Sequence, residues 1–468
     1  MQLFNTASRS KEPFVPLRPG KVNMYVCGVT VYDLCHIGHA RSALVFDVLV
    51  RFLRRKGLDV TFVRNFTDVD DKIIRRANEE GRDWKEVAET YIKAFHEDMD
   101  ALGVLRADVE PRATEYMDAI IALCEELVQK GFAYATPSGD VYFAVRSFPQ
   151  YGKLSHRSLD DMQAGARVAP GEEKRDPMDF AVWKAAKPGE PFWDSPWGKG
   201  RPGWHIECSA MSNRYLGTTM DIHCGGSDLI FPHHENEIAQ SEAANDAKFV
   251  NYWVHNGFIN VDNKKMSKSL GNFFTVREAA EAYGYDCIRM FMLMSHYRSP
   301  LNYSGEILMQ AKAALERLST AKDNLDFFVQ YGDDRDMSEE EAAFAQSLDA
   351  YRDKFCEAMD DDFNTANAIS AIYELVREIN ARVNPNAHPS KALAEACRAI
   401  YLELSDVLGI PFIERRDELT EEQQALFEAR KAARKEKNWA ESDRIRDELK
   451  AQGILVEDTP QGMKWKRA

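Results

Sequence analysis

The chain has 468 residues, a net charge of −15 and 44% hydrophobic residues, which is globular composition with length for about three domains. No apolar run approaches the 18 residues of a membrane helix, and the opening MQLFNTASRSKEP lacks the apolar core of a secretory signal. The acidity argues against a general nucleic-acid coat. The eight cysteines are scattered, so they indicate metal binding or catalysis rather than a disulfide framework. A cytoplasmic protein is expected.

The clearest unit spans residues 21–65. Val22, Met24 and Val26 alternate with their neighbours as in a strand, and the apolar residues between positions 44 and 53 recur at helical spacing. A second strand is predicted at 60–66. The order strand, helix, strand predicts a parallel sheet, whose ligands bind at the carboxyl ends of the strands.

The rest of the chain is expected to alternate between helices and short strands before it becomes helical. We expect helices over most of 68–135, a hairpin at 133–145 and an irregular stretch at 147–203. Strands are expected at 220–224 and 253–261, and helices at 232–245, 276–283 and from 304 to 407. The tail is basic, because residues 430–467 hold eleven Lys or Arg against seven Asp or Glu.

These patterns predict four parts. A Rossmann-like α/β catalytic domain occupies 1–100 and 216–303, and an α/β connective insertion occupies 101–215. An all-α bundle at 304–408 and a small mixed α/β domain at 412–468 follow.

Two motifs could bind a nucleoside triphosphate. His36-Ile37-Gly38-His39 lies between a predicted strand and helix, where histidines and free N–H groups can meet phosphate oxygens. The alternative is a helix cap with incidental histidines. Lys264 to Gly271, KKMSKSLG, places lysines around a small serine, so it can close over phosphates as charge builds on pyrophosphate. Its alternative is a basic surface turn.

A third motif has the character of a metal site. In His233-His234-Glu235-Asn236-Glu237, the first and last residues share a helical face, and we expect His234 to point elsewhere. Cys27 and Cys208 would complete a zinc site of two Cys, one His and one Glu. Spacing alone does not select these cysteines over Cys35 or Cys224, and a buried apolar role is the alternative for any single cysteine.

A fourth motif, His223-Cys224-Gly225-Gly226-Ser227-Asp228, follows a predicted strand. Its glycines allow a ligand to approach closely, and Asp228 can accept hydrogen bonds from ribose hydroxyls.

Together the motifs resemble the class I aminoacyl-tRNA synthetases, through HIGH at 36–39 and KMSKS at 265–269, and the cysteinyl-tRNA synthetase family in particular. The resemblance covers essentially the whole chain, and further matching segments are CGVTVYD at 27–33, NFTDVDDK at 65–72, GWHIECS at 203–209, FPHHENE at 231–237 and NWAESDRIR at 438–446.

The resemblance implies a ligase that activates L-cysteine with ATP and transfers it to tRNA(Cys). It implies one Zn²⁺ per chain as cofactor and Mg²⁺ with ATP, and a monomer is expected. The implied sites are zinc at Cys27, Cys208, His233 and Glu237; cysteine at Gly28, Thr67, Trp204 and His223; and ATP at His36, Gly38, His39, Gly226, Asp228, Lys265 and Lys268. His36, His39 and Lys268 are the residues expected to stabilise transition-state charge. Zinc suits the substrate thiolate far better than a serine hydroxyl, so no editing domain is expected.

One position departs from the family, since Cys224 stands where the first of three glycines is usual after the histidine. We expect a packing role for it. The bundle and the tail are implied to contact the tRNA anticodon stem and anticodon. Three rival hypotheses are a cysteine ligase acting on an amino-sugar, as in mycothiol synthesis, a zinc hydrolase built on HHENE, and a non-catalytic RNA-binding relative. The basic tail and the complete motif set favour the synthetase.

Overall fold

The structure is a computed structural model that describes residues 1–159, 173–265, 272–410, 419–459 and 462–467. The chain divides into two units, Met1–Leu308 with Met359–Thr365, and Met309–Ala358 with Ala366–Ala468. Among the helices of the described residues, none is both long and apolar enough to cross a membrane.

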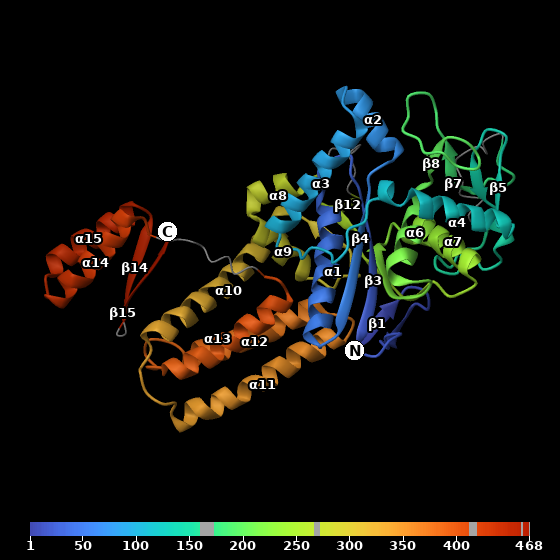
Figure 1. Ribbon diagram of the computed structural model, residues 1–468. Coiled ribbons are helices and arrows are strands. Elements are labelled where there is room, and N and C mark those ends of the chain that lie inside the picture. Colours follow the sequence, from blue (N-terminus) through green and yellow to red (C-terminus); the bar gives the residue numbers. More distant parts are fainter. Residues whose placement is uncertain (160–172, 266–271, 411–418, 460–461, 468) are drawn as a thin grey trace. The chain divides into compact units, whose positions relative to one another are not determined.

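A four-stranded parallel sheet forms the middle of the first unit (Figure 1). Its strands, in spatial order, are β10 (Val250–Asn256), β9 (Met220–Gly226), β3 (Lys21–Thr30) and β4 (Asp59–Thr67). Helix α1 (Ile37–Arg55) joins β3 to β4, which confirms the predicted strand–helix–strand unit. Strand β3 has β4 on one side and β9 on the other, so the strand order reverses direction between β3 and β9. The carboxyl ends of these two strands meet at this topological switch point, where such sheets bind ligands.

Helices cover both faces of this sheet. Helix α1 packs with α8 (Val276–Tyr283) and α9 (Tyr285–Leu293) on one face. Tyr25 and Val63 face the other way and join a core with α4 (Met117–Gln129), α6 (Trp204–Leu216) and α7 (Glu235–Asn245). Successive strand residues point to opposite faces, so β3 and β4 have both faces buried.

The insertion contains more sheet than its sequence indicates. The predicted hairpin of β5 (Ala133–Ala135) and β6 (Val141–Phe143) is present, but β7 (Phe180–Ala185) and β8 (Gly200–Pro202) extend it to four antiparallel strands. The expectation of irregular structure over 147–203 was therefore wrong at these strands. Their partners are distant in sequence, and Gly, Pro and Trp obscure the two-residue period.

Strand β8 leads through Gly203 directly into α6. A Cβ atom at Gly203 would lie 2.0 Å from the Ala181 carbonyl oxygen, so the close passage of β7 requires glycine. The predicted strand at 253–261 is also divided, into β10 and β11 (Ile259–Val261). Gly257 separates them, where a Cβ would lie 2.6 Å from the Arg298 carbonyl oxygen.

The first unit has further elements outside these two sheets and their covering helices. They are β1 (Gln2–Asn5), β2 (Ser10–Pro13), α2 (Asp71–Glu80), α3 (Trp84–Ala101), η1 (Ala113–Glu115), η2 (Val145–Ser147), η3 (Ile230–His234), β12 (Lys264–Lys265) and β13 (Leu301–Tyr303).

The second unit contains most of the predicted helical bundle. Its helices are α10 (Gly305–Tyr331), α11 (Glu339–Asp360), α12 (Thr365–Arg382) and α13 (Lys391–Val407). The Tyr401 hydroxyl donates to the Leu318 carbonyl oxygen at 2.8 Å, and the Tyr373 hydroxyl donates to that of Ala314 at 2.8 Å, so α12 and α13 are both joined to α10. The expected all-α character is confirmed.

The C-terminal module, residues 419–467, has the expected mixed α/β character. Helices α14 (Glu421–Lys435) and α15 (Trp439–Ala451) precede the antiparallel strands β14 (Ile454–Thr459) and β15 (Gly462–Arg467). Its core joins Phe427, Ile445 and Leu449, with Trp465 packed against it. Trp439 is instead 55% exposed, so it is not a core residue of the module.

Candidate functional site

The residues predicted to bind zinc meet at the carboxyl ends of the central strands. Cys27 lies on β3, Cys208 on α6, His233 on η3 and Glu237 on α7, and their ligand atoms all lie within 4.8 Å of one another. Cys27 Sγ is 3.7 Å from Cys208 Sγ and 3.4 Å from Glu237 Oε1. A tetrahedral zinc places neighbouring ligand atoms roughly 3.3–3.8 Å apart, so this set of donors fits the ion in chemistry and in spacing.

A bulge in β3 directs Cys27 into the cluster. The pairing of β3 with β4 shifts register between Val26 and Val29, so Cys27 and Gly28 lie in the irregular segment. A Cβ at Gly28 would lie 1.5 Å from the Asn65 carbonyl oxygen, and therefore only glycine fits. The Gly28 amide donates to Asn65 Oδ1 at 2.9 Å, and Cys208 Sγ lies 3.8 Å from that same oxygen. Asn65 thus contacts the chain beside both cysteines.

Three residues of the cluster are buried and Cys27 is half-buried, and the pKa values of the four groups shift in different directions. Burial, followed by the neighbouring Cys208 and Glu237, raises the pKa of the Cys27 thiol well above its ordinary value. The hydrogen bond from Cys27 lowers the pKa of Cys208 to about 6 despite burial. Burial opposes the charge on His233, but Glu237 and Cys208 outweigh it and raise the pKa to about 10. Metal ligands must lose such protons, so metal binding here releases them.

His234 also faces this cluster, and the expectation that it points elsewhere was wrong. Its Nε2 lies 3.3 Å from Cys27 Sγ, and the ring is fully buried. On a helix the residues three and four positions before Glu237 both lie on the same face as Glu237, so the three-residue spacing brings His234 to the cluster just as the four-residue spacing brings His233. Cys27, His223, His234 and Glu237 form a second group with metal-ligand spacing.

Further histidines hold the cluster from outside. His205 Nδ1 lies 2.8 Å from His233 Nδ1, and Gln240 donates to the His205 carbonyl oxygen at 2.9 Å. On the other side, His234 Nδ1 lies 2.7 Å from His255 Nε2. Such outer partners fix the orientation of ligating imidazoles. Neither Cys35 nor Cys224 belongs to either metal-compatible group in the described part of the chain, and Cys224 is a fully buried strand residue, as its expected packing role requires.

The residues predicted to line the cysteine pocket surround the same cluster. Gly28 is in the bulge, and Thr67 ends β4. His223 Nε2 donates to Glu237 Oε2 at 2.8 Å, which, with His233, holds the pKa of Glu237 well below its ordinary value although burial acts the other way. Trp204 is 39% exposed, and its ring centroid lies 4.3 Å from that of His233. The bound position of cysteine stays a prediction.

Glu207 lies within the GWHIECS segment, and no role for it is predicted from the sequence. The Thr67 hydroxyl donates to Glu207 Oε2 at 2.8 Å, and both side chains are at most 2% exposed. Glu207 precedes Cys208 on α6, and Thr67 is two residues after Asn65 on one face of β4. Two polar contacts therefore join β4 to the start of α6. A buried carboxylate beside a predicted pocket residue is a signal that sequence alone does not carry.

The HIGH motif forms the start of α1. His36 is the cap residue, and its Nδ1 accepts from the Gly38 and His39 amides at 3.1 and 3.3 Å. The rings of His36 and His39 stack with centroids 3.6 Å apart. His36 therefore caps the helix, as the alternative hypothesis expects, and the same turn is where phosphate binding is predicted. The positive end of the helix dipole lies here, at the edge of the sheet that carries the cluster.

The other predicted ATP residues are only partly described. Gly226 ends β9, and Asp228 is exposed two residues later. The Lys265 main chain belongs to β12, and Lys268 lies outside the described residues. Their contacts with ATP stay predictions.

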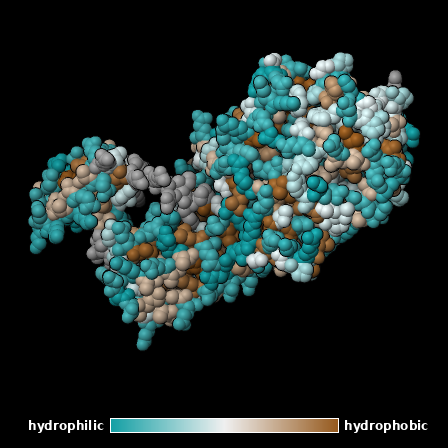
Figure 2. All heavy atoms as spheres, in the orientation of Figure 1, coloured by the Kyte–Doolittle hydropathy of each residue, from teal (hydrophilic) through white to brown (hydrophobic). Residues whose placement is uncertain are grey.

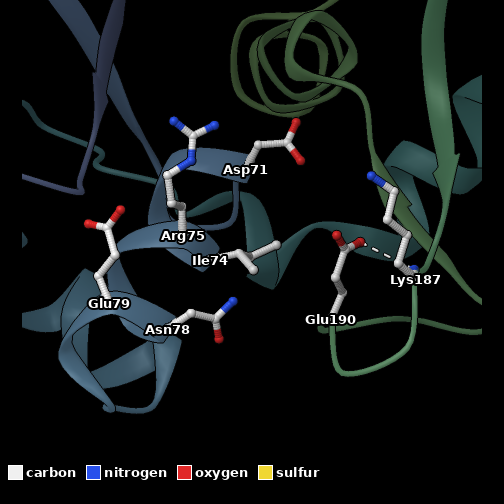
Figure 3. A pocket seen from close by; sticks show the side chains of 7 residues that line it. All are labelled: Asp71, Ile74, Arg75, Asn78, Glu79, Lys187 and Glu190. Carbon is white, nitrogen blue, oxygen red and sulfur yellow. Dashed lines mark hydrogen bonds between the residues drawn. The ribbon is translucent and has the colours of Figure 1, made fainter.

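A polar cleft of about 680 Å³ lies between α2 and the loop after β7 (Figure 3). Asp71 and Arg75 extend from α2, and Lys187 and Glu190 face them. Asp71 also pairs with Lys184 and Arg201 of the insertion sheet. None of the predicted site residues lines this cleft, so we assign the chemistry to the buried cluster instead.

Three family models match the chain. The model of the tRNA synthetases class I (C) catalytic domain matches residues 13–313, the DALR domain matches 354–413, and the cysteinyl-tRNA ligase anticodon binding domain matches 416–465. The catalytic match includes every predicted zinc, cysteine and ATP residue.

Curated relatives and solved structures agree with these matches. Cysteine–tRNA ligases of Nitratidesulfovibrio vulgaris strains Hildenborough and DP4 are each 55% identical, covering 99% of this chain and 99% of theirs. The methionyl-tRNA synthetase of Mycobacterium tuberculosis with methionyl-adenylate shares the fold at 17% identity, with a TM-score of 0.61 over 83% of this chain and 90% of that one. The LeuRS–tRNA–LeuAMS complex of Agrobacterium radiobacter K84 does so at 13% identity, TM-score 0.61 and 85% of each chain. By full-length identity and by its catalytic domain, this chain belongs to the cysteine–tRNA ligase family of class I tRNA synthetases.

Proposed function

We propose that the chain is a cysteine–tRNA ligase that forms cysteinyl-adenylate from L-cysteine and ATP and then transfers cysteine to tRNA(Cys). The observation that carries this function is the group of two thiols, an imidazole and a carboxylate, three of them buried, at the sheet edge where the HIGH turn begins α1. Full-length identity to curated relatives supports the same reaction. The rival amino-sugar ligase is not favoured, because the match extends through an anticodon-binding domain.

We propose Zn²⁺ at Cys27, Cys208, His233 and Glu237. When bound there, zinc supplies a soft Lewis acid for the thiolate of the substrate, which a serine hydroxyl replaces poorly. The chain fixes the donors: the β3 bulge positions Cys27, the helical spacing brings His233 Nε2 within 2.9 Å of Glu237 Oε1, and His205 orients the imidazole from outside. Discrimination by a thiolate-binding centre explains how the enzyme can work without editing.

Adenylate formation would take place at the adjoining HIGH turn. The carboxylate of cysteine attacks the α-phosphate of ATP, a C–O–P linkage forms, and pyrophosphate with its Mg²⁺ leaves. His36 and His39 would orient the phosphates at the amino end of α1, and Lys265 and Lys268 would offset the charge that develops. A terminal ribose hydroxyl of the tRNA then attacks the carbonyl carbon, the bond from that carbon to the phosphate oxygen breaks, and AMP leaves with the hydroxyl proton on its phosphate. Positioning and charge supply the catalysis, so no general base is assigned.

The C-terminal module would contact the anticodon. At the turn between α14 and α15, Lys435, Lys437 and Trp439 are exposed, and the Arg434 guanidinium lies 5.5 Å from the centre of the Trp439 ring. Cations can hold RNA phosphates and an exposed aromatic ring can stack on an unpaired base. Figure 2 shows that the visible face of this module is predominantly hydrophilic. A monomeric state and a cytoplasmic location are proposed on the sequence alone.

The test separates the two half-reactions. The full chain should exchange pyrophosphate with ATP in the presence of cysteine but not serine, and should charge tRNA(Cys). Removal of residues after 411 should preserve exchange and reduce charging, with a weaker salt dependence of tRNA binding because fewer counterions are released. Transfer of cysteine to an amino-sugar but not to tRNA would overturn the proposal.

A further inference from the structure

A fully buried arginine follows the HIGH turn on α1. Arg41 comes two residues after His39 and is 0% exposed. Its Nη1 donates to the Phe258 carbonyl oxygen at 2.6 Å, and its Nη2 donates to the carbonyl oxygen of Tyr297 at 3.0 Å and to that of Ser299. No described acidic side chain pairs with this guanidinium, and burial lowers its pKa to about 10. A buried cation held in this way by main-chain carbonyl oxygens is costly to the fold.

A second buried arginine beside the same helix has the usual arrangement. Arg289 on α9 is also 0% exposed, but its Nη2 donates to the carboxylate of Asp47, a residue of α1, at 2.5 Å. A paired carboxylate is what normally accompanies a buried guanidinium. The packing of α1 can therefore supply such a partner, and the arrangement at Arg41 calls for a different explanation.

One carbonyl that Arg41 binds begins the chain that leads into KMSKS. Phe258 immediately precedes β11, which pairs with β12, and the motif starts at Lys265 in β12. The amide of Gly257 donates to the Tyr297 carbonyl oxygen at 2.9 Å, so the two chain segments that Arg41 contacts are also bonded to each other. Arg41 thus joins α1 to a single main-chain junction at the start of β11.

The chain that leaves KMSKS returns to the HIGH turn. The Ile37 amide, at the start of α1, donates to the Phe274 carbonyl oxygen at 3.2 Å. The Val276 amide donates to the Cys35 carbonyl oxygen at 2.8 Å. The described chain is therefore held to the start of α1 on both sides of KMSKS, by Arg41 before the motif and by main-chain hydrogen bonds after it.

The segment between α9 and β13 gives Arg41 a fixed anchor. The Tyr297 hydroxyl donates to Asp362 Oδ1 at 2.7 Å, and Arg298 Nε donates to Asp362 Oδ2 at 2.8 Å. Asp362 is 0% exposed and belongs to the same unit as α1. The carbonyl oxygens of Tyr297 and Ser299 are therefore held from the other side as well, so the contacts of Arg41 fix the start of α1 against a braced segment.

We propose that Arg41 is a positioning residue for adenylate formation, which holds the HIGH turn in register with the strand that carries the first KMSKS lysine. Groups that act on developing charge depend on such register, and a displacement of about 1 Å can cost about 100-fold in rate. The predicted cysteine pocket uses β3, β4, β9 and α6 instead, so it should not depend on Arg41. This inference rests on the proposed function, because it concerns the same reaction.

The first experiment compares the two half-reactions in the intact chain. Arg41→Met should slow single-turnover adenylate formation by about 100-fold. Equilibrium binding of cysteine should stay within about twofold of wild type, as should transfer to tRNA(Cys) from adenylate first accumulated on the variant with pyrophosphatase. Arg289→Met is the matched control, since it removes an equally buried guanidinium and should lower the Tm without slowing adenylate formation selectively. Equal slowing of both half-reactions in Arg41→Met, or a wild-type rate of adenylate formation, would overturn the proposal.

A second experiment asks whether Arg41 acts through KMSKS. In a Lys268→Ala background, Arg41→Met should slow adenylate formation by less than about tenfold further, because a misplaced lysine and a missing lysine lose the same interaction. Multiplication of the two single losses would overturn the proposal. Absence of cysteine-dependent adenylate formation in the wild type would instead overturn the proposed function, and this role with it.

Arg41→Lys carries the test if Arg41→Met does not fold. Lysine keeps the charge but lacks the planar fork that reaches several carbonyl oxygens, so adenylate formation should slow by about tenfold while transfer to tRNA(Cys) is unchanged. Unselective slowing in Arg41→Lys would contradict the positioning role. Failure of both variants to fold would assign Arg41 to folding alone and would also overturn it.

Discussion

The Cys/His/Glu cluster at the sheet edge and the exposed turn of the C-terminal module are two candidate binding sites of opposite character. In the cluster, His223, His233 and Glu237 are at most 1% exposed, and against the effect of burial the two imidazoles hold the pKa of the Glu237 carboxyl well below its ordinary value. At the turn between α14 and α15, Lys435, Lys437 and Trp439 are exposed to solvent. Buried donors have no water to replace a lost partner, whereas exposed cations are screened and contribute roughly independently. Single substitutions should therefore be severe in the first region and graded in the second.

The largest effect is expected from Cys208→Ser. Loss of one thiolate should abolish stoichiometric zinc and lower cysteine-dependent pyrophosphate exchange by more than about a hundredfold, since loss of an outer partner alone typically costs 10–100-fold. Elemental analysis and exchange assays measure both. Cys224→Ser is the matched control, because Cys224 is equally buried but outside the cluster. Normal zinc content in Cys208→Ser would remove Cys208 from the ligand set.

Lys268→Ala tests a cation that should act on rate rather than affinity, unlike the cations of the module. We expect adenylate formation to slow by about 10²–10³ while cysteine binding changes little, as is typical when one donor to developing charge is lost. Single-turnover kinetics and equilibrium binding of cysteine separate these quantities. Near-normal pyrophosphate exchange would contradict the assignment.

Much of this contrast was predictable from sequence, for local reasons. The strand–helix–strand unit at 21–65 has its pattern within one stretch of chain, and the ligand residues follow from motifs that resemble a known family. The second metal-compatible group was not predictable, because His234 and His255 come together only when η3 packs beside β10. Likewise, strands β7 and β8 depend on distant partners. The exposure of Trp439 depends on which face of α15 packs, and Ile445 and Leu449 occupy that face.

Glu207→Ala tests whether burial makes even an indirect contact important. Thr67 would lose its buried acceptor, and we expect the KM for cysteine to rise about tenfold with an unchanged KM for ATP. Glu207→Gln keeps an acceptor oxygen and should largely restore the wild-type value. Thr67→Val should resemble Glu207→Ala, and the double variant should be no worse than either one. Additive effects would show that the two side chains act independently. An equal rise in the KM for ATP would show that the pair only supports the fold.

Trp439→Ala addresses the exposed region. Loss of one stacking ring should weaken tRNA binding about five- to tenfold and leave cysteine-dependent exchange unchanged. Trp465→Phe is the control, since Trp465 packs against the module core and the change retains an aromatic ring there. Filter binding over a salt series measures the effect. Unchanged affinity in Trp439→Ala would leave the cations as the only candidate contacts of this turn.

The smallest effect on the reaction, and a test of whether burial matters within the module itself, is expected from Asp458→Asn. Asp458 accepts from the buried Arg430 at 2.7 and 2.8 Å and from Arg434 at 2.9 Å. Arg430, against the opposing effect of burial, and then Arg434 hold the pKa of Asp458 below its ordinary value. A depressed carboxyl pKa stabilises the fold above the unfolded pKa of about 3.9, and this stabilisation is lost as pH falls through the folded value. At pH 7 the variant should therefore lose about 1–3 kcal/mol of local stability, because Arg430 keeps fewer acceptors in its buried position.

Hydrogen exchange of the α14 and α15 amides in the intact chain measures this loss, and the difference from wild type should shrink on acidification below about pH 4. Asp443→Asn breaks only an exposed pair with Arg446 and should show little change at any pH. A difference for Asp458→Asn that persists unchanged in acid would mean that the amide disturbs packing around the buried Arg430 rather than charge, and the predicted contribution of the ion pair would be wrong.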